Sequence, residues 1–190
     1  THRGTLFPYT TLFRSSFFGA PSVFSIFTDS TDGPDYLQLQ HNTVAFEYSR
    51  IPFFGTSGMV SISENDTAIV SLGHLDVLNN IFMAKSDTGF QMTTEFHAYN
   101  LSSLKLIDSM NIDYNDYFIG ANLSDFAFID DATPITHTTL FDWKTGTNQD
   151  ANSDSLNPRF ISNSLLIPIE GLINNSGTPS FVTNDITGAV

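Results

Sequence analysis

The chain has 190 residues, no cysteine, and 20 acidic residues against seven basic ones, which gives a formal net charge of −13. Because phosphate binding needs clustered Lys and Arg, this balance argues against nucleic acid and anionic membranes as partners. A disulfide framework, a thiolate zinc site and a cysteine nucleophile are excluded, and no apolar run approaches the roughly 20 residues that cross a bilayer.

Residues 5–15 resemble the conceptual translation of a common sequencing adapter. We therefore set residues 1–15 aside as an artefact, since segments of this kind say nothing about the fold. Residues 16–190 have the length of one domain with one core, and we expect this domain to lack part of its N-terminal end. Without Arg3 and Arg14 it keeps five basic residues against 20 acidic ones, a composition typical of exported proteins. The lack of cysteine and the read-derived start favour a microbial source.

Alternation of apolar and polar residues with period two dominates the chain and predicts half-buried strands. The clearest cases are residues 44–48 and 60–63. Further strands are expected at 68–72, 90–99, 104–110, 117–120, 126–129, 136–143, 160–169 and 180–183. Asn, Asp and Gly turn signals separate them. Many short strands at this spacing predict an all-β fold, an antiparallel β-sandwich or barrel.

Two segments depart from this alternation. Residues 75–84 place Leu75, Leu78 and Phe82 at helical spacing, so we expect one short helix across an end of the sheets. Residues 146–157 have no apolar period and are expected to form a long exposed loop.

Residues 109–120 and 140–148 place acidic or amide side chains beside Gly and large aromatic residues, each at the end of a strand-like run. Residues 109–120 resemble, without a gap, the Ser-Met-x-x-Pro-Ser-x-Asp-Trp-Phe-x-Gly pattern of the spondin N-terminal domain family. Residues 140–148 resemble that family's Leu-Tyr-x-Trp-Asp-Ala-Gly-Thr-Asp segment, in the same chain order. The resemblance covers about residues 89–157. It implies a C2-like β-sandwich with calcium held by loops at one end.

The family's calcium ligands fall on Asp116, Lys144 and Asn148 of this sequence, so that only the first is still an acid. A lysine ammonium has three donors and no acceptor and cannot ligate a cation. We expect Lys144 to supply the positive charge that the metal supplies in the family, by pairing with Asp116 and hydrogen-bonding to Asn148. The alternative is a remodelled calcium site in which Asp142 and Asp113 replace the lost ligand.

Other residues are expected to support these loop ends. Gly120 and Gly146 allow backbone conformations or close approaches that a side chain forbids. Trp143, the only tryptophan, is expected to pack in the core under the loop ends. His74 lies near Asp76, but no His-x-x-x-His spacing and no Gly-x-Ser-x-Gly elbow occurs.

The resemblance implies a secreted or cell-surface protein without catalytic activity. We expect a binding or adhesion module in the extracellular space, with a protein or a glycan as its partner. Two alternatives stay open. One is a secreted carbohydrate-acting hydrolase, which needs two facing carboxylates with shifted pKa values in a concave pocket. The other is a purely structural cell-surface domain.

Overall fold

The computed structural model describes residues 3–5, 24–28, 36–48, 57–64, 72–86, 96–119 and 125–161. This part of the chain combines short strands, most of them paired in parallel, with one α-helix, and it is mixed α/β in class. The expected antiparallel β-sandwich is therefore wrong. Alternation shows which residues of a strand share a face, but it does not show which strands pair or in which direction.

The strands in the described ranges are three to eight residues long. In chain order they are β1 (Arg3–Thr5), β2 (Phe24–Thr28), β3 (Tyr36–Gln40), β4 (Thr43–Tyr48), β5 (Ser57–Glu64), β6 (Leu75–Leu78), β7 (Ile81–Ser86), β8 (Phe96–Leu101), β9 (Met110–Asp113), β10 (Asp116–Ile119), β11 (Ala127–Ile129) and β12 (Ile135–His137). The helices are a 3₁₀-helix, η1 (Leu104–Ser109), and an α-helix, α1 (Leu140–Thr147).

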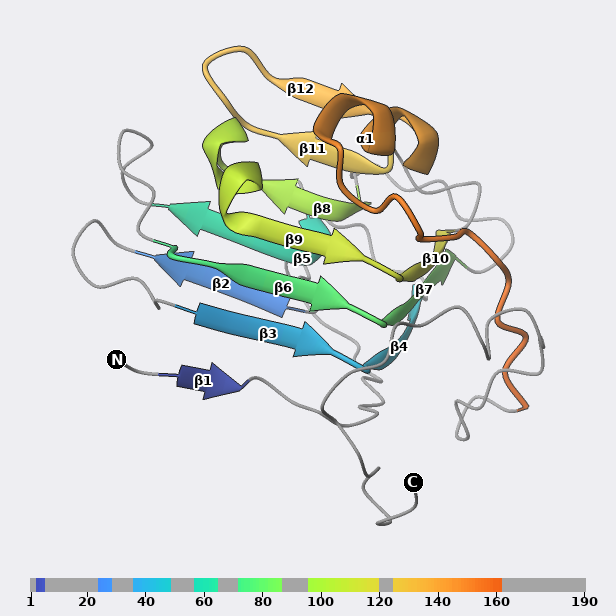
Figure 1. Ribbon diagram of the computed structural model, residues 1–190. Helices are drawn as coiled ribbons and strands as arrows, with labels where there is room; N and C mark the ends of the chain where they lie inside the picture. The colour runs from blue at the N-terminus through green and yellow to red at the C-terminus, as the bar shows by residue number, and fades with distance from the viewer. Residues whose placement is uncertain are drawn as a thin grey trace.

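From β3 to β11 the chain winds as a parallel solenoid, adding one strand to each of three sheets in turn before it returns to the first (Figure 1). The front sheet has the order β1-β3-β6-β9, the side sheet β10-β7-β4, and the back sheet β12-β11-β8-β5-β2. Two of these sheets are entirely parallel, and in the back sheet only β11 and β12 pair antiparallel. Each coil therefore packs on its neighbours along the chain, as in other solenoids.

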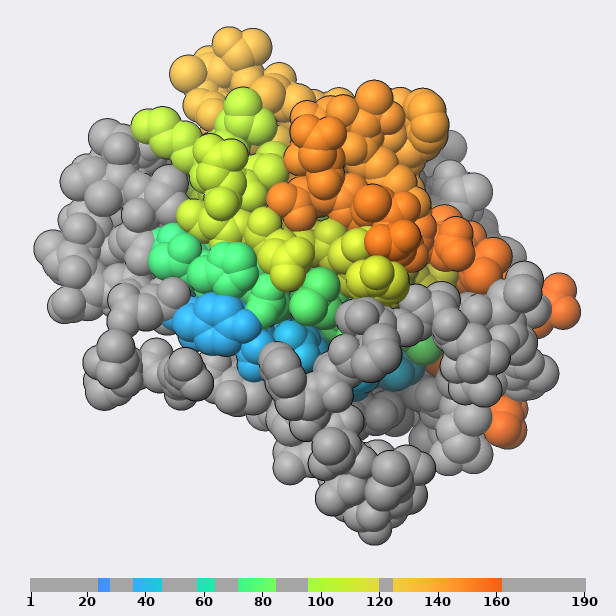
Figure 2. All heavy atoms as spheres, in the orientation of Figure 1, coloured from blue at the N-terminus to red at the C-terminus, as the bar shows by residue number. Residues whose placement is uncertain are grey.

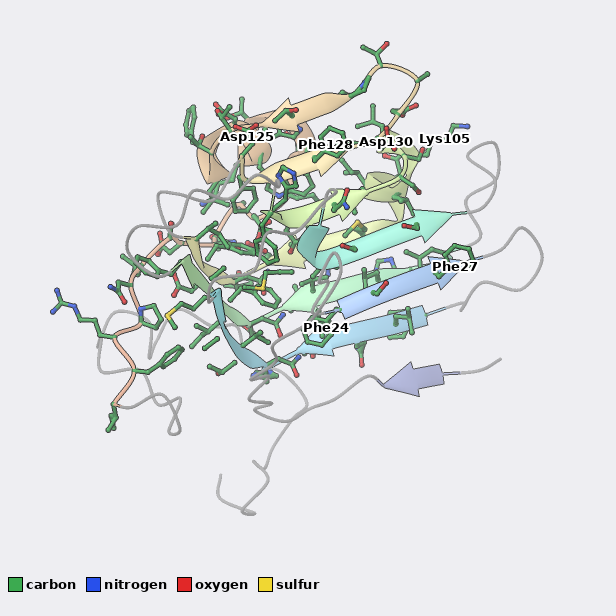
Figure 3. The ribbon with its side chains drawn as sticks, turned by 180° about the vertical axis from the view of Figure 1, so that it is seen from behind. Phe24, Phe27, Lys105, Asp125, Phe128 and Asp130 are labelled. Carbon is green, nitrogen blue, oxygen red and sulfur yellow. The ribbon has the colours of Figure 1, made fainter. Side chains whose placement is uncertain are left out.

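Apolar side chains of successive coils stack inside the solenoid, because neighbouring residues of a strand point to opposite faces. The stacked and buried residues include Leu37, Leu75 and Met110 of the front sheet, Val44, Phe82 and Tyr117 of the side sheet, and Val60, Tyr99 and Ala127 of the back sheet. Both faces are seen on β2. There Phe24 meets Phe82 edge-on at 6.4 Å, whereas Phe27 is 69% exposed (Figure 3).

Each corner between the front and side sheets has a left-handed residue followed by a buried asparagine. The left-handed residues are His41, Asn79 and Tyr114, with φ of 56°, 58° and 57°. The asparagines are Asn42, Asn80 and Asn115. Oδ1 of Asn80 accepts the backbone N–H of Asn42, and Oδ1 of Asn115 accepts that of Asn80, both at 3.0 Å. This ladder satisfies buried backbone donors and links each coil to the next.

The short helix expected at 75–84 is wrong, because these residues form β6, a corner and β7. Leu75 and Val77 face the core from β6, and Phe82 and Ala84 face it from β7. The core-facing residues are odd-numbered on β6 and even-numbered on β7, because the corner between the two strands shifts the alternation by one residue. Two short strands joined by such a corner therefore show a spacing close to that of a helix.

Strands occur as expected within residues 44–48, 60–63, 117–119 and 127–129. Residues 104–109 form η1 instead of a strand, and residues 136–143 are divided between β12 and α1. The expected strand at 90–99 appears from residue 96 as β8. Residues 68–71, 90–95 and 162–183, on which other expected strands fall, lie outside the described residues.

One end of the solenoid is closed by β12, α1 and the segment 148–156, all of which follow the last coil (Figure 1). Gln149 Oε1 accepts the N–H of Ile112 at 2.9 Å, and the N–H of Asp150 donates to the carbonyl of Ile112 at 2.6 Å. Beside β10, the N–H of Tyr117 donates to the carbonyl of Asp154 at 2.9 Å. The segment thereby covers the backbone edges of β9 and β10, which would otherwise be open to pairing with another chain.

Residues 148–157 contain no helix or strand and are mostly exposed, as expected, but two side chains anchor the segment. Asp150 and Ser153 are buried, with relative exposures of 0% and 2%. The absence of an apolar period gave no sign of these two anchors, because the segment is held by hydrogen bonds of polar groups and not by an apolar face.

Candidate functional site

The three positions that carry the family's calcium ligands do not come together. Lys144 Nζ donates to the carbonyl of Ser153 at 2.5 Å. Both residues are described, and Lys144 forms no ion pair with Asp116. Asn148 is the exposed, left-handed C-cap of α1, with φ of 58°. The expected charge pair between Lys144 and Asp116 is therefore not formed.

The two proposed replacement ligands have structural partners instead. Asp142 forms a capping box with Thr139 at the start of α1, and hydrogen bonds from Thr138 and Thr139 lower its pKa. Asp113 accepts two hydrogen bonds from Asn152, from its N–H and its Nδ2, both at 2.7 Å. Across the described ranges no group of three or more His, Cys, Asp or Glu side chains is placed to hold a metal ion.

The other residues singled out from the sequence support the cap, except that Gly120 lies outside the described residues. A Cβ added to Gly146 would lie 2.6 Å from Cε1 of His137, so a side chain does not fit there without movement of the imidazole. Trp143 is fully buried and stacks on Tyr99, with ring centroids 5.1 Å apart. This side chain extends from α1 into the end of the solenoid, where removal of a large aromatic costs about 3–5 kcal/mol.

Asp150 is the buried centre of the cap. Its carboxylate accepts hydrogen bonds from Trp143 Nε1 at 2.8 Å, the Tyr117 hydroxyl at 3.0 Å, Ser153 Oγ at 2.5 Å and Asn115 Nδ2 at 3.3 Å. Burial raises the pKa of Asp150, and these hydrogen bonds oppose the increase. Because its partners come from α1, β10, the asparagine ladder and the covering segment, the carboxylate ties the cap to the last coil.

Asp116 is a second buried carboxylate, but it is only half satisfied. Oδ1 accepts the N–H of Leu156 at 2.7 Å, and Oδ2 is buried without a hydrogen-bond partner. Burial raises the pKa of Asp116 to about 7, with a further contribution from Asp154. Asp116 precedes Tyr117, which donates to Asp150 inside the solenoid. The two carboxylates therefore lie on opposite faces of β10 and do not face each other across a pocket.

The outer face of the front sheet carries the most organised group of polar side chains. The group, here named the Asp76 cluster, consists of Tyr36, Gln38, His74, Asp76 and Asn111. Asp76 accepts from the Tyr36 hydroxyl, Gln38 Nε2, His74 Nε2 at 3.1 Å and Asn111 Nδ2 at 2.8 Å. Gln38 Nε2 also donates to the Tyr36 hydroxyl at 2.6 Å. Side chains from three adjacent strands and from His74 just before β6 are thus fixed around one carboxylate.

The register of the strands explains how the cluster forms. Gln38, Asp76 and Asn111 are directly paired neighbours on β3, β6 and β9. Tyr36 and His74 stack beside this row, with centroids 5.4 Å apart and planes 2° apart. Atoms of β3, β6 and β9 lie at the molecular surface on the front face, and this part of the surface has no deep hollow (Figure 2).

The charge of the cluster is set by Asp76, which is only 6% exposed. Burial alone would raise its pKa. The hydrogen bonds from Tyr36, Asn111, His74 and Gln38 outweigh burial, and the pKa is lowered. Asp76 is therefore an ionised acceptor that holds its neighbours, while Asn111 is exposed and the His74 side chain is 41% exposed. Such fixed rotamers reduce the entropy lost when a ligand binds.

A repeat in the sequence would have revealed both this row and the asparagine ladder. Residues 37–42, 75–80 and 110–115 share the pattern apolar-x-apolar-x-x-Asn. Its second position is Gln38, Asp76 or Asn111, and its first and third positions face the core. Repeats of 20 to 50 residues are the signature of solenoids, and here the pattern recurs after 38 and then 35 residues.

Within the described residues, no helix has both the length and the apolar character needed to span a bilayer. Comparison of the chain with protein-family models, with curated proteins and with solved structures finds no match.

Proposed function

We propose that this chain is a non-catalytic binding or adhesion module that acts outside the cell or on its surface, and that the Asp76 cluster is its ligand-binding face. The observation that carries the proposal is the pre-organised row on the front sheet. Asp76 is satisfied by its neighbours, whereas Asn111 is exposed and the His74 side chain is 41% exposed. Exposed polar side chains held by a rigid scaffold are typical of binding sites.

The carboxylates of the described residues favour binding over hydrolysis. A glycosidase needs a protonated acid and a second carboxylate flanking the same bond. Asp76 has a lowered pKa, and it is the only acid in its cluster. Asp116 of β10 and Asp150 of the cap have raised pKa values, but they lie on opposite faces of β10.

The proposal is tested by measuring binding of the purified chain to immobilised glycans and extracellular-matrix proteins by biolayer interferometry. Asp76→Ala should weaken the strongest interaction at least tenfold, because it releases the side chains of Tyr36, His74 and Asn111. Asp130→Ala is the matched control. It removes one exposed carboxylate that lies outside the cluster, after β11 of the back sheet (Figure 3).

Two results would argue against the proposal. Equal binding by the wild type and Asp76→Ala would place the ligand elsewhere. No binding to any member of the panel would favour a purely structural domain.

A further inference from the structure

We propose that the ligand of the Asp76 cluster is an uncharged, linear polysaccharide whose chain crosses the strands of the front sheet. This inference rests on the proposed function and adds the class of ligand and its direction. It is carried by the row of Gln38, Asp76 and Asn111 on three neighbouring strands, with the Tyr36 and His74 rings stacked beside it.

The charge of the three strands β3, β6 and β9 selects against polyanions. The strands β3, β6 and β9 carry two carboxylates, Asp76 and Asp113, and no Lys or Arg. The whole chain has a net charge of −13. An anionic polysaccharide or a nucleic acid would be repelled, since binding of such chains depends on clustered basic residues.

The side chains of the cluster suit hydroxyl groups. Amides of Gln38 and Asn111 both donate and accept, and the imidazole of His74 does so when neutral. The rings of Tyr36 and His74, which are stacked on each other and partly exposed, add carbon atoms beside the polar row. A sugar presents hydroxyl groups at its edge and C–H groups on its faces, so it can contact both kinds of surface.

The shape of the face favours an extended ligand. Small molecules bind in concave pockets, whereas the surface over β3, β6 and β9 is shallow (Figure 2). Neighbouring strands lie about 4.8 Å apart, so equivalent side chains recur at that interval along the solenoid axis. A polymer that repeats its hydroxyl groups can therefore contact successive strands in the same way.

The test is affinity gel electrophoresis with soluble polysaccharides in the gel: a neutral glucan, a neutral mannan and a neutral xylan, with polygalacturonate as the anionic probe. At least one neutral polysaccharide should retard the wild-type chain, and polygalacturonate should not. Asn111→Ala, an exposed position, should weaken retardation at least tenfold, and Asp130→Ala should leave it unchanged. Fluorescence of buried Trp143 reports whether each variant is folded. Isothermal titration with oligosaccharides of increasing length should show affinity rising until the chain spans three strands.

The outcomes separate this inference from the proposed function. Stronger binding to polygalacturonate than to neutral polysaccharides would overturn the inference. So would binding to a matrix protein alone, although the proposed function would stand if that binding required Asp76. If folded Asn111→Ala binds a neutral polysaccharide as the wild type does, the chain does not cross the proposed row. If no ligand depends on Asp76, both proposals fail.

Discussion

The backbone N–H and Nδ2 of Asn42 both donate to Oδ1 of Asn80 at 3.0 Å, and these bonds join the corners of two successive coils. Asn80 Nδ2 also donates to the carbonyl of Leu39 at 2.8 Å. Asn42 occupies the same position one coil earlier, but its own Oδ1 is buried without a partner. The two asparagines are alike in burial and differ in what their Oδ1 atoms accept.

We therefore expect Asn80→Ala to destabilise the protein more than Asn42→Ala. The first substitution leaves the buried N–H of Asn42 without its acceptor, at a cost of about 1–3 kcal/mol. The second removes an oxygen that accepts nothing and the donor Nδ2, but Oδ1 of Asn80 still accepts the N–H of residue 42. Urea unfolding of both variants provides the comparison, and equal losses would show that the ladder bond contributes little.

Asp150→Ala should be among the most damaging single substitutions. It leaves Trp143 Nε1 without its acceptor and removes the acceptor of Ser153 Oγ, and we expect a loss of about 2–4 kcal/mol in the free energy of unfolding. Asp130→Ala, at an exposed carboxylate, should change stability by less than about 0.5 kcal/mol. A small effect of Asp150→Ala in urea unfolding would mean that the cap does not depend on this carboxylate.

Asp116→Asn should have the opposite effect, and only at neutral and alkaline pH. The folded-state pKa of Asp116 is about 7, above the ordinary 3.8, so the folded chain binds this proton more tightly than the unfolded chain. The stability that comes from this group is present in full below pH 3.8 and is lost as the pH rises through about 7. The amide carries no charge and keeps an acceptor for the N–H of Leu156.

Melting curves at pH 5 and pH 8 test this expectation. Asp116→Asn should melt above the wild type at pH 8, and the difference should shrink at pH 5, where the wild-type carboxyl is protonated. Asp150 also has a raised pKa, but it is present in both proteins. Its effect on stability therefore cancels in the difference between the two melting temperatures. A constant difference between the two proteins at both pH values would contradict the shifted pKa.

Gly146→Ala should show strong coupling to His137. Alanine is favoured over glycine in a helix by about 1 kcal/mol, but its Cβ would meet His137 Cε1 at 2.6 Å. We expect Gly146→Ala to stabilise the protein when His137 is replaced by Ala, and not in the wild-type background. A double-mutant cycle from urea unfolding measures the coupling, and additive effects would show that the imidazole moves aside freely.

Calcium at millimolar concentration should leave the melting temperature unchanged. Binding to the native state would raise it by mass action. However, Asp113 and Asp116 on the last coil and Asp142 and Asn148 in the cap have separate partners or positions, and Lys144 Nζ donates to Ser153. Differential scanning fluorimetry with magnesium as the control tests this. A melting temperature that rises by several degrees with calcium, and not with magnesium, would show that the native chain has a calcium site.

The local properties of the chain were open to prediction. Alternation placed Val44 and Val60 in strands, and both face the core. It identified β10 and β11 to within a residue or two. The acidic charge and the burial of Trp143 also follow from residue types alone. The resemblance of residues 109–120 and 140–148 to spondin motifs predicted the wrong architecture, because short polar and aromatic patterns recur at the ends of strands in different folds.

The tertiary structure decided the rest, since it brings together residues that lie 35 to 38 positions apart along the chain. Side-chain alternation depends only on the geometry of one strand, so the sequence by itself determined which residues face inward. Parallel pairing, the asparagine ladder, the cap around Asp150 and the cluster around Asp76 depend instead on the register between coils. No single strand contains that information, because each of these contacts joins side chains from different turns of the solenoid.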